Sequence, residues 1–471
     1  MTNSFRAARH DAEHAGAARR SPFRPATSDL IRVGSRRWFL QAGLAGAAGL
    51  SLPQLLRFRA QGAFAARGKD RKSVILIWLS GGPSQLDTWD PKPDALSEVR
   101  GPFRSVATKV PGVRLCEHLP LQASIMDRLA LVRSVDCRTS ADHFPAPMQA
   151  GNPSAQRSKI DPHVGTHPSM GSVAARFRGP NDPAMPAYIG MADVNLFFAD
   201  VLGAGPLGGA YEAADGDKLA GRLTLPGAVS AGRAQDRADL CQQFDGLRRE
   251  LDRGDAMASM DHYRRQALEI TLSGKAQQAF RLEREPDRVR EAYGWHSLGE
   301  RTLLARRLVE AGTTFVTVSG TFGMFDNHGD DHFAGGLVKG LKPLLGRLDQ
   351  AVYALVNDLQ VRGMLDDTLV LAMGEFGRTP IFSQRGQGGR EHWINCMSML
   401  LAGGGIARGQ VVGATDAKGY DVKEARVTPS DLAATVYPHL GINLDTQWTD
   451  LQGRPQAIVT EGGRPIPALC S

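Results

Sequence analysis

The segment Ser73-Val74-Ile75-Leu76-Ile77-Trp78-Leu79, followed by Ser80-Gly81-Gly82-Pro83, decides the fold class of this 471-residue chain. An uncharged run rich in β-branched and large apolar residues is typical of a strand buried on both faces of a parallel sheet. The Gly-Gly-Pro turn ends that strand. Because parallel sheets have both faces covered by helices, the segment predicts an α/β fold.

Further short apolar runs repeat this pattern, and segments with helical spacing separate them. We expect strands at residues 129–132, 187–190, 314–319, 368–373 and 397–401. Apolar residues at steps of three and four predict a helix over 337–361, and Thr428-Pro429-Ser430-Asp431 begins another with a cap-like start. Alternation of this kind predicts a doubly wound α/β sheet.

The net charge of +7 belongs to the N-terminal part of the chain. Residues 1–65 carry ten Arg and three acidic residues, so the remainder has 46 basic and 46 acidic residues. A protein that binds nucleic acid needs a basic patch on its folded body, which displaces counterions from phosphates. We therefore expect no nucleic-acid partner.

The N-terminal part resembles an export signal. Ser35-Arg36-Arg37-Trp38-Phe39-Leu40-Gln41 is similar to the twin-arginine signature, residues 42–52 form a mild apolar run, and Ala63-Phe64-Ala65 offers a cleavage site. The alternative is a buried N-terminal helix, but eleven small apolar residues are too few to span a bilayer. We expect a periplasmic or secreted protein with no stable membrane span after cleavage.

The expected domain organisation follows from these features. Residues 1–65 form the twin-arginine signal peptide and leader, and residues 66–471 form one α/β domain. Residues 234–312 are charged and helical in character, and they are expected to form a helical insertion packed on the sheet. Five widely spaced cysteines without a CxxC pair indicate buried free thiols, with one disulfide as the alternative.

Polar clusters follow several predicted strands, at the edge where open α/β sheets bind their ligands. The first cluster comes after the Gly-Pro turn and contains Ser84, Asp87 and Asp90. Asp87 could hold a divalent cation there. These residue types also favour turn caps, so both interpretations stay open.

The second cluster is Thr139-Ser140-Ala141-Asp142-His143. A hydroxyl beside His and Asp suits nucleophilic attack, because an unactivated hydroxyl needs a base or a metal to lose its proton. Ser140 and His143 are therefore catalytic candidates. A Ser/Thr/Asp cluster is also typical of an ordinary loop.

The third cluster is Phe325-Asp326-Asn327-His328-Gly329-Asp330-Asp331-His332, beyond the strand predicted at 314–319. It places five Asp and His residues within seven positions. Carboxylate oxygen together with imidazole nitrogen is typical of zinc, manganese or iron sites. Asp326 and His328 are therefore candidate metal ligands, with a solvated loop as the alternative.

The fourth cluster combines Gly374-Glu375-Phe376-Gly377-Arg378-Thr379-Pro380 with Gly389-Arg390-Glu391-His392-Trp393. Glu375 and His392 are candidate metal ligands. Arg378 or Arg390 could clamp an oxyanion with two parallel hydrogen bonds. The structural alternatives are an Arg390–Glu391 ion pair and a half-buried His392 without a ligand role.

Taken together and in this order, these blocks resemble the exported family known only as domain of unknown function 1501, in the alkaline phosphatase-like (sulfatase-like) superfamily. The resemblance runs from about residue 73 to the C-terminus. The segments that carry it are Gly81-Gly82-Pro83-Ser84-Gln85-Leu86-Asp87, Pro168-Ser169-Met170-Gly171-Ser172, Asp326-Asn327-His328, Gly374-Glu375-Phe376-Gly377-Arg378-Thr379-Pro380, Arg390-Glu391-His392-Trp393, Gly403-Gly404-Gly405 and Gly413-Ala414-Thr415-Asp416.

The resemblance implies a three-layer α/β/α core with a mostly parallel sheet, one or two divalent metals at its carboxyl edge, and hydrolysis of phosphate or sulfate esters. By position, Asp326 and His328 match an Asp/His ligand pair, Glu375 stands near a late Asp-His dipeptide, and His392 stands near the final ligand. Ser140, with its neighbour Thr139 as substitute, lies closest to the nucleophile position. Zinc is the first expected metal, and manganese, calcium or magnesium are the alternatives.

This chain departs from the superfamily pattern in three places. Ser80-Gly81-Gly82 stands where a metal-binding Asp usually follows the first strand, and Phe376 replaces an imidazole. Cys137 is not followed by the residues of a formylglycine-type sulfatase.

Two functions therefore remain as expectations. The first is an exported metal-dependent hydrolase with a small-molecule or glycan ester as substrate. The second is a non-catalytic exported protein of the same fold that binds a polyanion or glycan. The sequence carries no signal for an oligomeric state.

Overall fold

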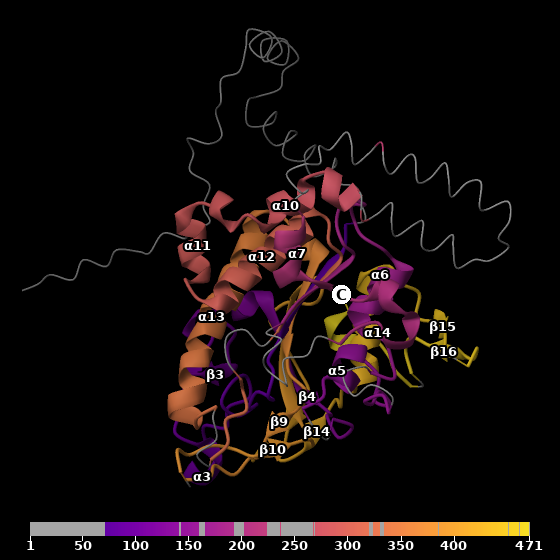
Figure 1. Ribbon diagram of the computed structural model, residues 1–471. Coiled ribbons are helices and arrows are strands. Elements are labelled where there is room, and N and C mark those ends of the chain that lie inside the picture. Colours follow the sequence, from indigo (N-terminus) through magenta and orange to yellow (C-terminus); the bar gives the residue numbers. More distant parts are fainter. Residues whose placement is uncertain are drawn as a thin grey trace, which may run out of the picture.

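The computed structural model describes residues 71–140, 143–159, 165–192, 202–223, 236, 267, 269–319, 324–329, 334–384, 386–450, 452–460 and 462–470. A central eight-stranded sheet lies between two layers of helices (Figure 1). Its strands, in spatial order, are β12 (Gln410–Val412), β4 (Leu129–Val135), β11 (Met397–Gly403), β8 (Thr368–Met373), β1 (Ser73–Trp78), β7 (Phe315–Ser319), β5 (Tyr188–Met191) and β6 (Ala214–Asp215). All six strands expected from the apolar runs are confirmed.

The sheet is parallel except at one strand. β11 runs antiparallel to both of its neighbours, β4 and β8, and every other pair of adjacent strands is parallel. The expectation of a mostly parallel sheet is confirmed. Because β11 is reversed, its amino end lies at the same edge as the carboxyl ends of β1, β4, β7 and β8. We call this the carboxyl edge.

Strand β1 shows why helices cover both faces. Successive side chains of a strand point to opposite faces. Val74, Leu76 and Trp78 belong to one hydrophobic core, while Ile75 and Ile77 belong to the other. All five are at most 2% exposed, so neither face of the strand meets solvent.

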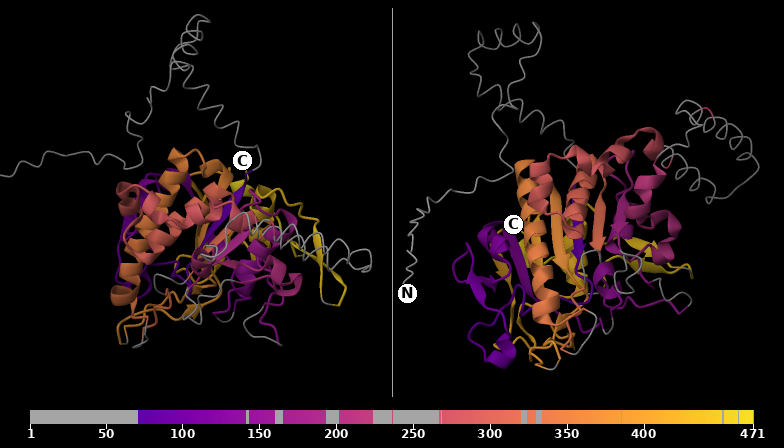
Figure 2. Two further views of the ribbon diagram at one scale, coloured as in Figure 1. Left: turned by 45° about the horizontal axis from the view of Figure 1, so that its top comes forward. Right: turned by 60° about the vertical axis from the view of Figure 1, so that its left-hand side comes forward.

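Helices of the two layers contribute to separate cores. The first face packs against α5 (Ala146–Ala150), α6 (Met170–Phe177) and α14 (Pro429–His439). The second face packs against α4 (Pro120–Ser124), α7 (Gly216–Arg222), α10 (Lys275–Phe280), α11 (Asp287–Tyr293), α12 (Ser297–Ala311) and α13 (Lys342–Val361). In the right-hand view of Figure 2, α12 and α13 lie side by side over the sheet. The fold is thus a three-layer α/β/α sandwich, as expected.

Both helices predicted from their sequence pattern are present. The helix expected over 337–361 consists of a π-helical turn, Leu337–Leu341, that continues into α13. At the start of α14 the Thr428 side chain accepts from the Asp431 N–H, and the Asp431 carboxylate accepts from the Thr428 N–H. This reciprocal capping satisfies two backbone donors at the helix start.

Short elements decorate the sandwich. They are α3 (Ser97–Arg100) and the antiparallel pairs β2 (Ser105–Ala107) with β3 (Arg114–Cys116), β9 (Gly377–Arg378) with β10 (His392–Trp393), β13 (Ala414–Thr415) with β14 (Val422–Glu424), and β15 (Gln447–Thr449) with β16 (Pro455–Ala457). In Figure 1, β9, β10 and α3 lie at the lower end of the sandwich.

Some sequence-based expectations fall on residues that the structure does not describe. The leader, with its export signature, lies outside the described residues, and so do residues 237–266 of the expected insertion. In the described remainder of that region, α12 packs against α13, β1 and β7. Among the described helices, none has the length and apolar character needed to cross a membrane.

The described cysteines are free thiols. Cys116, Cys137 and Cys396 are buried, and Cys470 is exposed. Burial raises the pKa of Cys116 and of Cys396 to about 12, so both stay protonated. The expectation of buried free thiols is therefore confirmed for Cys116, Cys137 and Cys396 but is wrong for the exposed Cys470, while Cys241 lies outside the described residues.

Candidate metal centre

Three polar side chains from distant parts of the chain meet at the carboxyl edge. His143 follows β4, Asp326 follows β7, and His392 lies in β10, shortly before the reversed strand β11. Each offers one ligand atom, and these atoms all lie within 4.8 Å of one another. The three residues therefore form a group that could hold a metal ion.

A third imidazole completes this group. His328 Nε2 lies 2.8 Å from Asp326 Oδ1, and His392 Nε2 and His143 Nε2 lie 3.2 Å and 3.4 Å from the same oxygen. Asp326 is 2% exposed, so these nitrogens surround a buried carboxylate. We call His143, Asp326, His328 and His392 the His–Asp cluster.

Two glutamates hold the far sides of two imidazoles. Glu375 Oε1 lies 2.8 Å from His143 Nδ1, and Glu391 Oε2 accepts a hydrogen bond from His328 Nδ1. A carboxylate only accepts, so each Nδ1 carries a proton and donates it to its glutamate. Each Nε2 faces the Asp326 carboxylate and donates to it when protonated; a metal ion bound there would take the place of that proton. Histidines that bind metals typically donate their other ring N–H to a carboxylate in this way. The donor set therefore fits a metal ion.

Glu375 is a second, independent indication that this site suits a positive charge. Its side chain is fully buried, and Oε1 also accepts from the Gly81 N–H at 2.8 Å. Its second oxygen, Oε2, is buried without a hydrogen-bond partner among the described residues. A buried carboxylate oxygen without a partner is costly, and a cation or a proton removes that cost.

The pKa shifts in the His–Asp cluster also indicate that this site requires positive charge. Burial by itself would lower the pKa of His143, but hydrogen bonds to Asp326 and Glu375 raise it to about 9. The hydrogen bond to Asp326 also raises the pKa of His328, whereas burial lowers the pKa of His392. Burial would raise the pKa of Asp326, yet the three imidazoles hold it well below its usual range. The carboxylates thus require positive charge, which protons or a divalent cation can supply.

The glycine turn after β1 lets the backbone approach this centre. A Cβ on Gly81 would lie 2.6 Å from the Asp326 nitrogen, and a Cβ on Gly82 would lie 2.6 Å from the Phe376 ring. Both glycines have a positive φ, 101° and 82°. Phe376 is buried, and its ring centroid lies 5.1 Å from that of His143 and 4.7 Å from that of His392. Phe376 therefore lies beside two imidazoles, and the Gly81-Gly82 turn packs closely against Asp326 and Phe376.

Arg378 holds the turn in place. Its guanidinium donates to the carbonyl oxygens of Gly81, Gly82 and Arg390 and to Asp326 Oδ1. It is 1% exposed. The sequence predicts an oxyanion clamp at this position. In the structure the hydrogen bonds of the guanidinium go to the turn after β1, to the Arg390 carbonyl and to Asp326.

Asp87 and Arg390 form a buried ion pair. Arg390 Nε lies 2.6 Å from Asp87 Oδ2, and both side chains are fully buried. Arg390 also donates to the carbonyls of Val99, Thr379 and Pro380, so it ties α3 to the loop after β9. Asp87 was expected as a metal ligand and Arg390 as an oxyanion clamp. The structure instead gives each the other as its main charged partner, so we leave both out of the catalytic proposal.

Ser140 lies in the loop that leads from β4 to His143. Its N–H donates to the Cys137 carbonyl at 2.7 Å, and the residue is 2% exposed. Its Oγ has no hydrogen-bond partner among the described residues. The described part of the fold therefore does not engage this hydroxyl. Asp142, from the same cluster, lies outside the described residues.

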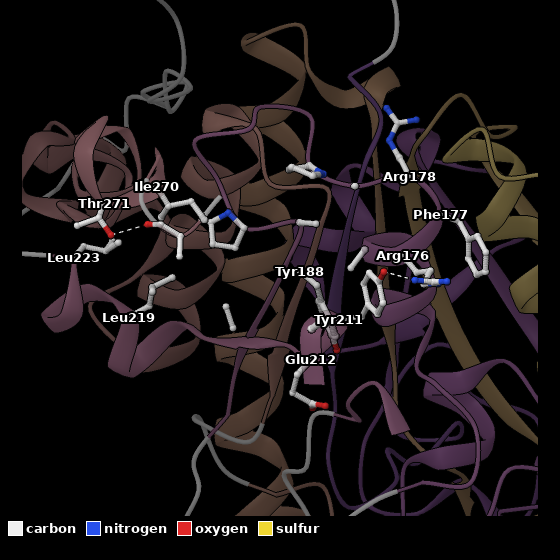
Figure 3. Close-up of a pocket in the computed structure, with 18 residues that line it drawn as sticks. Arg176, Phe177, Arg178, Tyr188, Tyr211, Glu212, Leu219, Leu223, Ile270 and Thr271 are labelled. Carbon is white, nitrogen blue, oxygen red and sulfur yellow. Dashed lines mark hydrogen bonds between the residues drawn. The ribbon is translucent and has the colours of Figure 1, made fainter. Parts of the chain in front are cut away.

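A separate hollow of about 710 Å³ lies around the amino end of β5 (Figure 3). Arg176, Tyr188, Tyr211 and Ile270 are among its lining residues, and the Arg176 guanidinium donates to the Tyr211 hydroxyl. No member of the His–Asp cluster lines it. Parallel strands of an open α/β sheet present ligand sites at their carboxyl ends, so the candidate centre is the cluster.

Sequence reasoning identified part of this centre. It selected Asp326, His328 and His392 as ligands, but it placed His143 in a catalytic role and Glu375 among the ligands. The structure places His143 in the group that could hold a metal ion, and the Glu375 carboxylate at Nδ1 of the His143 ring. Glu391 was missed, although its position between two selected residues, Arg390 and His392, was a signal.

No curated protein matches this chain in sequence. Among solved structures, PsFucS1 sulfatase from Pseudoalteromonas sp. is similar at 12% identity and a TM-score of 0.35, covering 81% of this chain and 70% of that one. Ps i-CgsB in complex with k-i-k-neocarrahexaose is similar at 11% identity and a TM-score of 0.30, covering 79% and 72%. Similarities this low carry no information on activity.

One family model matches most of the chain. It spans residues 71–470 and carries the description "Protein of unknown function (DUF1501)". The match includes the whole sheet and all four residues of the His–Asp cluster. The chain therefore belongs to the DUF1501 family.

Proposed function

We propose that this protein is a metal-dependent hydrolase that acts on a phosphate or sulfate ester. One observation carries the proposal: three imidazole Nε2 atoms converge on Asp326, while carboxylates hold the Nδ1 atoms of His143 and His328. This arrangement of imidazoles and outer carboxylates is typical of metal sites. The family resemblance supports the same chemistry.

The four residues of the His–Asp cluster would hold the metal. Three imidazoles and one carboxylate favour Zn²⁺, with Mn²⁺ second, because Ca²⁺ and Mg²⁺ prefer oxygen ligands. Bound there, a divalent cation would lower the pKa of a hydroxyl or water and neutralise charge that develops on the ester oxygens. Glu375 and Glu391 would orient two of the imidazoles.

Ser140 is the proposed nucleophile, with Thr139 as the alternative. Ser140 lies three positions before His143 in the sequence. Its Oγ has no hydrogen-bond partner in the described part of the chain. In the proposed reaction Oγ attacks the phosphorus or sulfur atom, the ester bond to the leaving alcohol breaks, and the serine proton ends on that alcohol. Water then hydrolyses the serine ester and regenerates the hydroxyl.

The proposed substrate is a small-molecule or glycan ester. The proposed location is the periplasm or the exterior, because the leader resembles a twin-arginine signal.

A formylglycine mechanism is not proposed. Cys137 is followed by Arg138-Thr139-Ser140-Ala141, which lacks the required pattern, and its thiol is fully buried.

Metal content and turnover test this function together. Protein purified without chelator is expected to contain about one divalent metal per chain, and His143→Ala is expected to lose it. His118→Ala is the matched control, because His118 packs against Phe103 outside the cluster. Aryl phosphate and aryl sulfate serve as substrates, and Ser140→Ala is expected to abolish turnover without loss of metal. Metal-free wild type, or full turnover by Ser140→Ala, would contradict the proposal.

The alternative is a non-catalytic exported protein that binds a polyanion or glycan. The observation that favours it is Phe376, which fills the side of the cluster where the resemblance implies another imidazole. This alternative predicts metal in the wild type but no turnover of either aryl ester. It also predicts retention on a sulfated-glycan column that is lost in His392→Ala.

A further inference from the structure

We propose that Glu391 is a positioning residue: it holds the His328 ring in the orientation that binds the metal, and so sets the affinity of the centre. The inference rests on the metal centre of the proposed function and deepens it. It concerns metal affinity, which can be measured without any substrate.

His328 is held at both ring nitrogens. Nδ1 donates to Glu391, while Nε2 lies 2.8 Å from Asp326 Oδ1 and 3.1 Å from His392 Nε2. The hydrogen bond at Nδ1 fixes a proton there, so Nε2 is the nitrogen that would bind the metal, which would displace the proton that Nε2 otherwise donates to Asp326. Without Glu391 the ring could rotate or move its proton to Nε2, and either change removes a metal ligand.

Hydrogen bonds to Thr379 fix the backbone of Glu391. Its carbonyl accepts from the Thr379 N–H at 2.8 Å, and its own N–H donates to Thr379 Oγ1 at 2.9 Å. The residue before it, Arg390, is fully buried, and the residue after it, His392, belongs to the cluster. Three consecutive residues therefore anchor the segment, orient one imidazole and supply another.

Exposure distinguishes Glu391 from its counterpart Glu375. The Glu391 side chain is 54% exposed, whereas that of Glu375 is 1% exposed and also accepts a backbone hydrogen bond. A change at Glu375 would disturb the core as well as His143. A change at Glu391 removes the partner of His328 and leaves the buried structure intact, so Glu391 is the better residue for a test.

The test measures Zn²⁺ affinity on the full chain after removal of metal by chelator. Glu391→Ala is expected to weaken binding by about 10- to 100-fold, the usual effect of losing the outer partner of a metal-bound histidine. Glu391→Gln is expected to fall between wild type and Glu391→Ala, because its amide oxygen still accepts from Nδ1. Glu98→Ala is the matched control, since Glu98 is an exposed glutamate in α3. Thermal melting of the four metal-free proteins is expected to be equal.

A double-mutant cycle with His328→Ala separates positioning from a general charge effect. If Glu391 acts through His328, Glu391→Ala weakens binding in the wild type but has no further effect in His328→Ala. An equal loss in both backgrounds would overturn the inference, because the carboxylate would then act only as a distant negative charge. Equal Zn²⁺ affinity of wild type and Glu391→Ala would also overturn it.

The outcomes for the two proposals are distinct. If wild type binds no Zn²⁺, the metal centre fails, and the proposed function and this inference fail with it. If wild type binds Zn²⁺ and Glu391→Ala binds equally well, only the role of Glu391 is rejected.

Discussion

The Nε2 atoms of His328 and His392 lie 3.1 Å apart, although the two residues are 64 positions apart in the chain. One imidazole comes from the loop after β7 and the other from β10. Glu391 accepts a hydrogen bond from His328 Nδ1, so the two Nε2 atoms can share either one proton or one metal ion. This short approach makes the His–Asp cluster the most direct target for experiment.

Asp326→Asn should abolish tight metal binding. The substitution keeps the shape of the side chain but removes the charge that faces three imidazoles and Arg378. We expect Zn²⁺ affinity to fall by more than about 100-fold, because a ligand matters more than an outer partner of a ligand. Competition with a zinc-sensitive dye measures this. Unchanged affinity would show that the cation, if any, binds elsewhere.

Arg390→Met should strongly destabilise the fold. The Asp87–Arg390 pair is fully buried, so the substitution leaves a buried carboxylate without its partner. We expect the free energy of unfolding in urea to drop by about 3–5 kcal/mol. Lys109→Met is the control: its pair with Asp127 is similar in length, 2.8 Å, but lies largely in solvent, and a change of about 0–1 kcal/mol is expected.

Adding Asp87→Asn to Arg390→Met should restore part of the lost stability, because it removes the unpaired charge. A drop in Arg390→Met no larger than in Lys109→Met would contradict the structural role given to this pair.

Gly82→Ala should cost more stability than Gly112→Ala. The two glycines have nearly the same φ, 82° and 81°, so the backbone penalty of about 1–2 kcal/mol is shared. Only at Gly82 would the added Cβ meet the Phe376 ring, at 2.6 Å, while nothing lies within 4 Å at Gly112. We expect an extra loss of about 1–3 kcal/mol from this overpacking. Urea unfolding of both variants decides the point, and equal losses would argue against the close approach.

Ser140→Ala should leave stability unchanged or slightly raised. Its Oγ is buried without a hydrogen-bond partner among the described residues, so removing it leaves no partner unsatisfied. If Ser140 is the nucleophile, turnover of an aryl ester should fall by at least about a thousandfold in the same protein. A clear loss of stability would show that the hydroxyl has a structural partner instead.

Stability should depend on pH through Asp349, a residue of α13 that is 3% exposed. Burial raises the pKa of its carboxyl to about 7, although the N–H groups of Leu121 and Gln122 oppose this shift. Between about pH 4 and pH 7 the folded protein therefore keeps a proton that the unfolded chain has lost, so stability falls as pH rises.

Asp349→Asn should remove this contribution, which amounts to up to about 4 kcal/mol. The measurement is urea unfolding of wild type and Asp349→Asn across that pH range. Parallel curves for the two proteins would contradict the expected titration.

Most of the fold could be predicted from local patterns. Uninterrupted apolar runs such as residues 73–79 and 368–373 identify buried strands because both faces must exclude water. The three- and four-residue spacing in 337–361 identifies a helix because one face must be apolar. The direction of β11 could not be predicted, because an apolar run looks the same in a parallel and in an antiparallel strand. That direction decides where His392 lies: because β11 is reversed, residues before it share the edge with residues after β4, β7 and β8.

The sequence by itself determined the fold class, the family resemblance and the residue types available for metal chemistry, because hydrophobic periodicity and residue chemistry are local properties. Only the tertiary structure decided which of these side chains contact one another. Arg390 pairs with Asp87, and Glu375 and Glu391 bind the Nδ1 atoms of His143 and His328. His143, predicted as a partner of the nucleophile, lies next to Asp326. Each partner lies in another segment of the chain, and a hydrogen bond or ion pair between segments depends on distances that only the packed sheet sets.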